Sequence, residues 1–229
     1  MTIAIMQPYF FPYIGYWQLI NAVDLFVIFD DVNFIKKGYV NKNSILVAGK
    51  SQSFTLELLK SSQNRLINEI EVGGNSVKIL KTITMAYKKA PYFDKVYPMI
   101  EKILTCNEKN LAYFLGHSLM QISSYLDIGT KFIYSNEIEK DNSLRAQDKI
   151  LDILKRVNAT HYINAIGGQE LYDKECFIKQ NIKLNFLMPK IENYKQFKNE
   201  FVPSLSIIDI LMFNSIEEIK LMLNNYRLV

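Results

Sequence analysis

The stretch "TIAIMQPYFFPYIGYWQLINAVDLFVIFDDV", residues 2–32, decides the fold. Its first apolar run, residues 2–6, reads as a short, fully buried strand. Residues 13–23 read as a helix that packs back on this strand, and residues 25–32 as a second buried strand that ends in two carboxylates. Strand, helix and strand within about thirty residues predict a βαβ opening, the unit from which parallel sheets are built.

The rest of the chain continues this alternation after an antiparallel excursion. Residues 39–58 predict a β-hairpin that turns at "AGK" (48–50). The further elements expected from the pattern are helices 76–89, 92–104 and 109–126, strand 129–138, helix 142–158 with Asn142 or Ser143 as its cap, strand 161–166, helix 169–181, strand 182–189, and two apolar helical stretches within 204–226 that are broken near Asn214.

This order of elements predicts an α/β fold. We expect a Rossmann-like, mostly parallel sheet with an inserted β-hairpin and helices, followed by a C-terminal helical tail. A single domain over residues 1–229, with the insertion at about 34–128, is expected because no repeat, low-complexity segment or disordered linker divides the chain.

The composition is that of an ordinary folded protein and narrows its partners. Of 229 residues, 49% are hydrophobic and 22% charged, and the net charge of +4 is spread without a lysine or arginine run. We therefore expect no nucleic acid as a partner. No apolar stretch approaches the roughly 20 residues of a membrane span, and the N-terminus lacks the pattern of a signal peptide. Cys106 and Cys176 lie far apart, which favours a reducing cytoplasm.

Polar residues follow several of the predicted strands. In an open parallel sheet, ligands bind at the carboxyl ends of the strands, near the point where the strand order reverses. Polar strand ends are also common simply because loops are wet, but their joint occurrence here favours a site. The residues concerned are Gln7, Asp30, Asp31, Asn33, Ser135, Asn136, Asn164, Gly167 and Gly168.

Two of these features carry specific chemistry. Asp30 and Asp31 could hold Mg²⁺, bind a ribose or act as a general base, or one could cap a turn while the other is solvated. Adjacent strand residues point to opposite faces, so we expect only one of the pair to face a ligand. The Gly167–Gly168 pair between a strand and a helix is compatible with an anion site, although the specific nucleotide-binding motifs are absent.

The segment 36–43 adds charge and amides close behind the two carboxylates. Lys36, Asn41 and Asn43 could neutralise a phosphate and orient a sugar or an amide. The alternative is a soluble hairpin edge guarded by lysine. His117 and His161 have no metal-ligand spacing around them, so we expect no zinc site.

Four motifs stand out along the chain: "IAIMQPYFFPYIGYWQLI" (3–20), "FVIFDDVNFIKKGYVNKNSI" (26–45), "YINAIGGQELY" (162–172) and "FVPSLSIIDILMFN" (201–214). Together they resemble the WbqC-like protein family, which is found in bacterial gene clusters for O-antigen and other surface polysaccharides. Relatives often have proline where this chain has Ala165. The matching positions are Gln7, Pro8, Pro12, Gly15, Tyr16, Asp30, Asp31, Lys36, Asn41, Asn43, Asn164, Gly167, Gly168, Tyr172, Pro203, Ser206 and Asp209.

The resemblance implies a cytoplasmic enzyme that modifies a nucleotide-activated amino sugar, by acyl or aminoacyl transfer to its amine. In that hypothesis Asp30 or Asp31 is the general base, and Lys36 with the Gly167–Gly168 amides binds a phosphate or an oxyanion. The expected partners are the nucleotide sugar and an acyl or aminoacyl donor, with room for Mg²⁺ and a homo-oligomer. The remaining substrate-binding residues expected are Gln7, Tyr13, Tyr16, Asn41, Asn43, Asn164 and Tyr172.

Two other functions stay open at this point. One is a nucleotidyl-transfer or adenylating enzyme, although Tyr13 and Tyr16 stand where the HxGH-type histidines of such enzymes would be. The other is a non-catalytic binding protein of a polysaccharide assembly complex, with the apolar tail 205–223 as an oligomer surface. For the opening stretch, we expect Gln7 and at least one of the two tyrosines to face a cleft shared with Asp30 or Asp31, and Trp17 and Leu19 to face the core.

Overall fold

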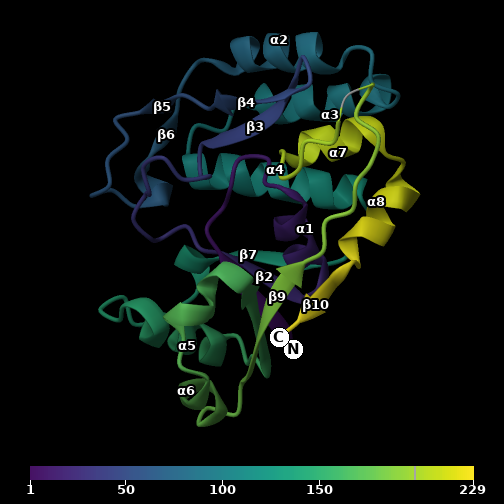
Figure 1. Cartoon of the computed structure of the whole chain (residues 1–229). Coiled ribbons are helices and arrows are strands. Elements are labelled where there is room, and N and C mark those ends of the chain that lie inside the picture. Colours follow the sequence, from purple (N-terminus) through teal and green to yellow (C-terminus); the bar gives the residue numbers. More distant parts are fainter. Residues whose placement is uncertain (199) are drawn as a thin grey trace.

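A six-stranded sheet forms the centre of the computed structural model, which describes residues 1–198 and 200–229 (Figure 1). Its order is β10-β9-β8-β1-β2-β7, and only β10 runs antiparallel to its neighbour. The strands are β1 (Thr2–Met6), β2 (Leu25–Ile28), β7 (Lys131–Tyr134), β8 (His161–Ala165), β9 (Lys183–Pro189) and β10 (Tyr226–Leu228).

The five parallel strands confirm the predicted Rossmann-like sheet. Taken in chain order they lie as 3-2-1-4-5, with β1 in the middle between β2 and β8. The order reverses between β1 and β8, because the chain first builds outward from β1 in one direction and later returns to its other side. That reversal places the carboxyl ends of β1 and β8 at the usual ligand crevice of doubly wound sheets.

Helices cover both faces of the sheet, as the alternation of side chains along β1 requires. Ile3 and Ile5 pack on one face with helices α5 (Ala146–Arg156) and α6 (Lys174–Ile178). Ala4 packs on the other face with the larger core, which contains α1 (Ile14–Asn21) and α4 (Leu111–Tyr125). The structure is therefore a three-layer α/β arrangement (Figure 1).

The chain between β2 and β7 forms most of the layer that covers the α1 side of the sheet. It contains the predicted hairpin and three helices, which lie above α1 in Figure 1 together with α7 (Ile207–Phe213), while α8 (Ile216–Leu223) lies beside α1. Among the described residues no helix is long and apolar enough to cross a membrane. The elements of this segment are β3 (Lys42–Val47), β4 (Lys50–Thr55), β5 (Leu58–Leu59), η1 (Ile67–Glu69), β6 (Glu71–Val72), α2 (Ser76–Tyr87), α3 (Phe93–Leu104) and α4.

Several local expectations need correction. Helix α5 begins at Ala146, after an extended Arg145 that makes no side-chain cap, rather than at Asn142 or Ser143. Ser143 instead donates to Asp141 within the preceding turn. The expected strand 129–138 ends at Tyr134 and continues as the 3₁₀ turn η2 (Ser135–Glu137). The expected helix 169–181 is divided into the 3₁₀ segment η3 (Ile166–Leu171) and α6.

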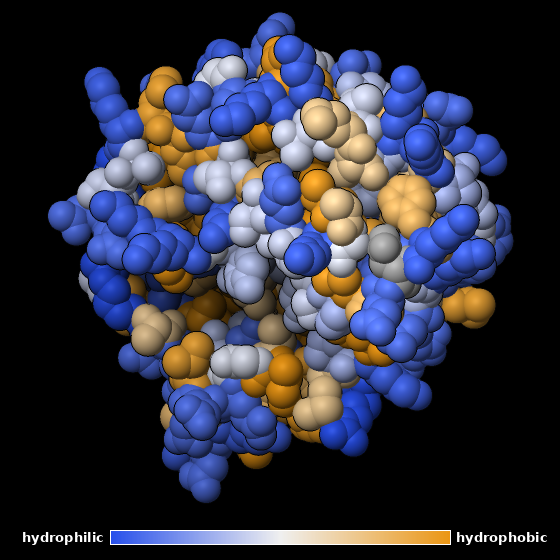
Figure 2. Space-filling model, turned by 45° about the horizontal axis from the view of Figure 1, so that its top comes forward, coloured by the Kyte–Doolittle hydropathy of each residue, from blue (hydrophilic) through white to orange (hydrophobic). Residues whose placement is uncertain are grey.

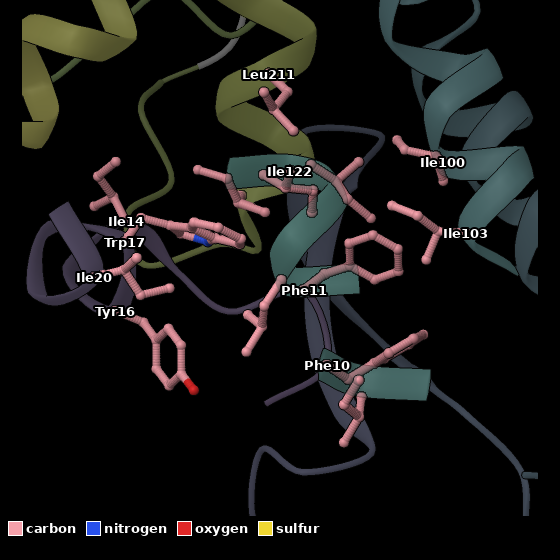
Figure 3. Packing of buried hydrophobic residues seen from close by; sticks show 14 of the residues in the cluster. Phe10, Phe11, Ile14, Tyr16, Trp17, Ile20, Ile100, Ile103, Ile122 and Leu211 are labelled. Carbon is pink, nitrogen blue, oxygen red and sulfur yellow. The ribbon is translucent and has the colours of Figure 1, made fainter. Parts of the chain in front are cut away.

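The loop after β1 is fixed by its two phenylalanines. Phe10 and Phe11 are fully buried, and Phe11 points among Ile100 and Ile103 of α3 (Figure 3). Phe11 has a φ of 44°, in the left-handed region that non-glycine residues rarely adopt. Hydrogen bonds hold this turn: the Asn43 amide donates to the carbonyls of Phe10 (3.1 Å) and Phe11 (2.7 Å), and the Ser206 hydroxyl donates to Phe11 (2.7 Å).

Candidate functional site

Two pockets lie next to each other along the carboxyl edge of the sheet. The first, of about 470 Å³, lies at the ends of β1 and β8, and we call it the switch-point pocket. The second, of about 910 Å³, lies at the ends of β2 and β7 and is lined by Lys140 and Lys149, so we call it the lysine pocket. Phe29 lines both of them. Figure 2 shows one face of the molecule, with a hollow near the centre of the view bordered by apolar and hydrophilic side chains alike.

Tyrosines form one wall of the switch-point pocket. The rings of Tyr9 and Tyr16 lie 5.4 Å apart, and those of Tyr9 and Tyr39 lie 5.9 Å apart, measured between centroids. Tyr9, Tyr13 and Tyr39 also line a third pocket of about 360 Å³. The same aromatic side chains thus border two hollows, and aromatic faces in such a position can stack on a planar ligand ring.

Tyr16 supports this wall rather than standing free in it. Its ring is almost fully buried, and its hydroxyl donates a 2.8 Å hydrogen bond to the backbone carbonyl of Gln7. Burial raises the pKa of Tyr16 well above its usual value, so the hydroxyl remains a donor at any physiological pH. Gly15 allows Tyr13 to approach closely, because a Cβ at Gly15 would lie 2.6 Å from the Tyr13 ring.

The opposite wall comes from the end of β8 and from η3. Asn164 is buried, and its side-chain oxygen accepts a 2.8 Å hydrogen bond from the Ala165 amide. A Cβ at Gly168 would lie 2.6 Å from the Asn164 amide nitrogen, so glycine is what lets these two residues meet. Nothing lies within 4 Å of the Cβ position of Gly167, which leaves open space on that side of its backbone. Tyr172 completes this wall.

Asp30 has a structural position. Its side chain is completely buried and accepts hydrogen bonds from the Asn136 amide (3.0 Å) and the Asn68 side chain (3.1 Å). Burial raises the pKa of Asp30, and these hydrogen bonds offset part of the rise. Asp30 ties the end of β2 to η1 and η2 and lines none of the three pockets.

Asp31 points to the lysine pocket instead. One carboxylate oxygen lies 2.8 Å from the ammonium of Lys140 and 3.1 Å from that of Lys149. Burial alone would raise the pKa of Asp31, but hydrogen bonding to Lys140 and the charges of both lysines outweigh it, so the pKa lies below its ordinary value. Two ammonium groups already contact this oxygen, and their positive charges disfavour a cation such as Mg²⁺ beside Asp31.

The three loop residues predicted from the sequence have different surroundings in the structure. The Asn43 amide is used by the loop after β1, and Asn41 donates a 2.9 Å hydrogen bond to the Leu56 carbonyl, so both hold backbone. Asn43 also lines the third pocket. Lys36 is exposed and lines none of the three pockets.

The structure therefore brings some of the predicted site residues together in one pocket and places the others elsewhere. Gln7 lines the switch-point pocket and Asp31 lines the adjoining lysine pocket, with Phe29 common to both, so the single cleft expected for Gln7 and Asp31 is instead two neighbouring pockets, and Asp30 lines neither. Lys140 and Lys149 were missed, although a lysine four residues before Ile153 on the buried stripe of α5 was a visible signal. The predicted residues that meet at the switch-point pocket are Gln7, Tyr13, Tyr16, Asn164, Gly167, Gly168 and Tyr172.

Comparison with known proteins identifies the family. The model of the WbqC-like protein family matches residues 7–221, which is nearly the whole chain. The chain belongs to the WbqC-like protein family. A curated relative of the WbqC-like protein, "Uncharacterized protein Rv1507c" of Mycobacterium tuberculosis (strain ATCC 25618 / H37Rv), is 26% identical over 214 residues, or 91% of this chain and 92% of the relative. No solved structure matches this chain.

The positions of the acidic, histidine and cysteine side chains bear on whether this WbqC-like protein can hold a metal ion. Within residues 1–198 and 200–229, no group of three or more His, Cys, Asp or Glu side chains is placed to hold a metal ion. His161 is engaged with Asn185 at 3.0 Å, and burial lowers its pKa. The chemistry available at the carboxyl edge is thus aromatic stacking in one pocket and charge in the other.

Proposed function

We propose that this WbqC-like protein is a transferase of bacterial surface polysaccharide biosynthesis that moves an acyl or aminoacyl group onto the amine of a nucleotide-activated sugar. The observation that supports it best is the pair of pockets at the carboxyl edge, with Phe29 lining both. A transferase must hold two substrates side by side, and two unlike pockets that share a side chain meet this need.

The nucleotide sugar fits the switch-point pocket better than the lysine pocket. Its base can stack on the aromatic wall of Tyr9, Tyr13 and Tyr39, because stacking on aromatic side chains accepts any planar base. Its phosphates can meet the open backbone at Gly167, where no side chain stands in the way. We place the reaction in the cytoplasm, since Cys106 and Cys176 are both free thiols.

In this reaction the amine nitrogen attacks the acyl carbon, the bond from that carbon to the donor's leaving group breaks with its electron pair going to the leaving group, and the proton lost by the nitrogen passes to that leaving group. Neither Asp30 nor Asp31 is well placed to take that proton. Asp30 is out of reach of a ligand, and Asp31 is a weak base between two ammonium groups. We therefore assign the main catalytic contribution to holding amine and acyl carbon together, which can supply several orders of magnitude in rate.

Calorimetric titration of UDP- and dTDP-sugars into the protein tests the first half of this proposal. Tyr39 is 62% exposed and lines the aromatic wall, so Tyr39→Ala spares the core and should weaken binding roughly tenfold by removing one stacking face. Leu221→Ala, at a residue 74% exposed on α8, is the matched control and should bind as the wild type does.

A folded protein that binds none of these sugars, or a Tyr39→Ala variant that binds them unchanged, would contradict the proposal. Mg²⁺-dependent consumption of ATP without any added sugar would favour an adenylating enzyme instead.

A further inference from the structure

The floor of the lysine pocket contains a buried group of three charges. The side chains of Lys140 and Lys149 are 2% and 9% exposed, and both contact the same carboxylate oxygen of Asp31, whose side chain is 10% exposed. Among the residues that the structure describes, Asp31 is the only carboxylate paired with either lysine. One negative charge thus faces two positive ones, which leaves one positive charge unbalanced at the floor.

The two lysines differ in the donors that they have left. Lys140 directs its ammonium to Asp31 and to the carbonyls of Ser135 and Ile138, which uses its three N–H groups. Among the described residues Lys149 hydrogen-bonds only to Asp31, through the backbone carbonyl at 3.0 Å and the carboxylate at 3.1 Å, and its ammonium also lies 5.2 Å from the centroid of the Phe29 ring. Its third N–H therefore remains for a ligand, and Lys149 lines the pocket.

Arg145 and the N-terminus of α5 also face this pocket, whereas Asp148 of the first turn is exposed and does not line it. Arg145 and Ala146 line the lysine pocket, so the N-terminus of the helix faces it. Arg145 does not cap its own helix and instead donates to the carbonyls of Asn142 (2.7 Å) and Leu144 (3.0 Å). Its guanidinium is exposed and has further N–H groups to offer an anion.

Acidic residues of the same pocket limit the size of the anion. Glu137 and Glu139 are exposed members of the lining, so the lining as a whole carries as many acidic as basic side chains. The positive surplus is local to the floor. A single compact charge fits this distribution, whereas a chain of phosphates would meet the two glutamates.

We propose that the lysine pocket binds a compact anionic group, a carboxylate or a phosphate, through Lys149 and Arg145. Asp31 and Lys140 are positioning residues that hold the Lys149 ammonium in place. Identification of this anion as part of the group donor rests on the proposed function, but anion binding at the pocket does not depend on it.

NMR titration of the ¹⁵N-labelled full chain with sodium phosphate and, separately, sodium acetate tests the proposal. We expect saturable shifts of the Ala146 and Gln147 amides with at least one of the two anions. Arg145→Gln should weaken that binding roughly tenfold, because it removes a charge-assisted contact from an exposed residue. Lys155→Gln, which removes the same charge near the other end of α5, should leave the affinity within about twofold.

The affinity for UDP- and dTDP-sugars, measured in the same variants, separates this proposal from the previous one. We expect it to be unchanged in Arg145→Gln. The proposal is overturned if neither anion gives saturable shifts, or if Arg145→Gln and Lys155→Gln weaken anion binding equally. It is also overturned if Arg145→Gln loses nucleotide-sugar affinity in parallel, because that result would place the sugar's own phosphates in this pocket. A wild-type protein that binds the anion but none of the nucleotide sugars would instead contradict the proposed function alone.

Discussion

Asp30 and Asp31 are neighbours in sequence, yet their surroundings move their pKa values in opposite directions. Burial dominates at Asp30 and raises its pKa, since its partners are neutral amides. At Asp31 the two lysines outweigh burial and lower it. The expected strand 25–32 ends at Ile28, so both residues lie in the loop that follows β2, where Asp30 serves the packing between β2, η1 and η2 and Asp31 serves a pocket.

The Asp31 carboxylate should make the protein sensitive to acid. Its pKa is lower in the folded state than its ordinary value near 3.8, so its stabilising effect is complete above that value and is lost as the pH falls through the lower one. Asp31→Asn leaves two buried ammonium groups without a counter-charge and should cost roughly 3–5 kcal/mol at neutral pH. Urea unfolding at pH 7 and below pH about 4 should show the gap from the wild type narrowing in acid.

Asp127→Asn is a matched control, because Asp127 pairs with Lys220 at 2.9 Å on the surface. We expect it to change stability little at either pH, since exposed pairs contribute little. A gap between wild type and Asp31→Asn that stays constant in acid would show that the lysine pair does not act through the carboxylate's charge.

At this scale the sequence predicts where polar residues lie better than what they contact. The strand exits Gln7 and Asn164 were expected near a ligand crevice from the topology alone, and both line the switch-point pocket. The partners of Asp31 were not foreseeable in the same way, since Lys149 is separated from it by 118 residues. Such pairing depends on how β7 and α5 return to the sheet, which side-chain periodicity does not encode.

At the scale of elements, the loop after β1 is held largely by one side-chain amide. Asn43, on β3, donates hydrogen bonds to the carbonyls of both Phe10 and Phe11. Asn43→Ala should leave the buried Phe10 carbonyl without this donor and the Phe11 carbonyl with Ser206 alone, and should cost roughly 1–3 kcal/mol in urea unfolding. Asn21→Ala, which loses only an exposed 3.2 Å bond to Asn224, should cost less than about 0.5 kcal/mol. Equal losses in the two variants would contradict this account of the loop.

Elements with strong periodicity were predictable, and short or irregular ones were not. The apolar stripe of α5 and the continuous apolar run of β1 locate both elements, because each buries a face that the pattern displays. The 3₁₀ segment η3 has no buried residues, so nothing in its pattern marks it. The strand β10 spans three residues, too few for a recognisable alternation.

At the scale of the whole molecule, β10 protects the sheet. It pairs antiparallel with β9 and covers an edge that would otherwise expose unpaired backbone groups. Deletion of residues 226–229 should therefore lower stability and increase self-association, measured by light scattering. Leu228→Ala keeps the backbone ladder and, as the control, should remain as monodisperse as the wild type; an equally dispersed control would assign the effect to the lost side chain.

The Phe10–Phe11 turn also has a consequence for biosynthesis. Its unusual backbone is held from β3 by Asn43 and from the start of α7 by Ser206, and Ile207 donates a further 3.0 Å bond to the Pro12 carbonyl. The loop after β1 is thus completed by residues made nearly two hundred positions later. A nascent chain has this βαβ unit early, but the loop that carries the aromatic wall can take its final shape only after α7 has been made.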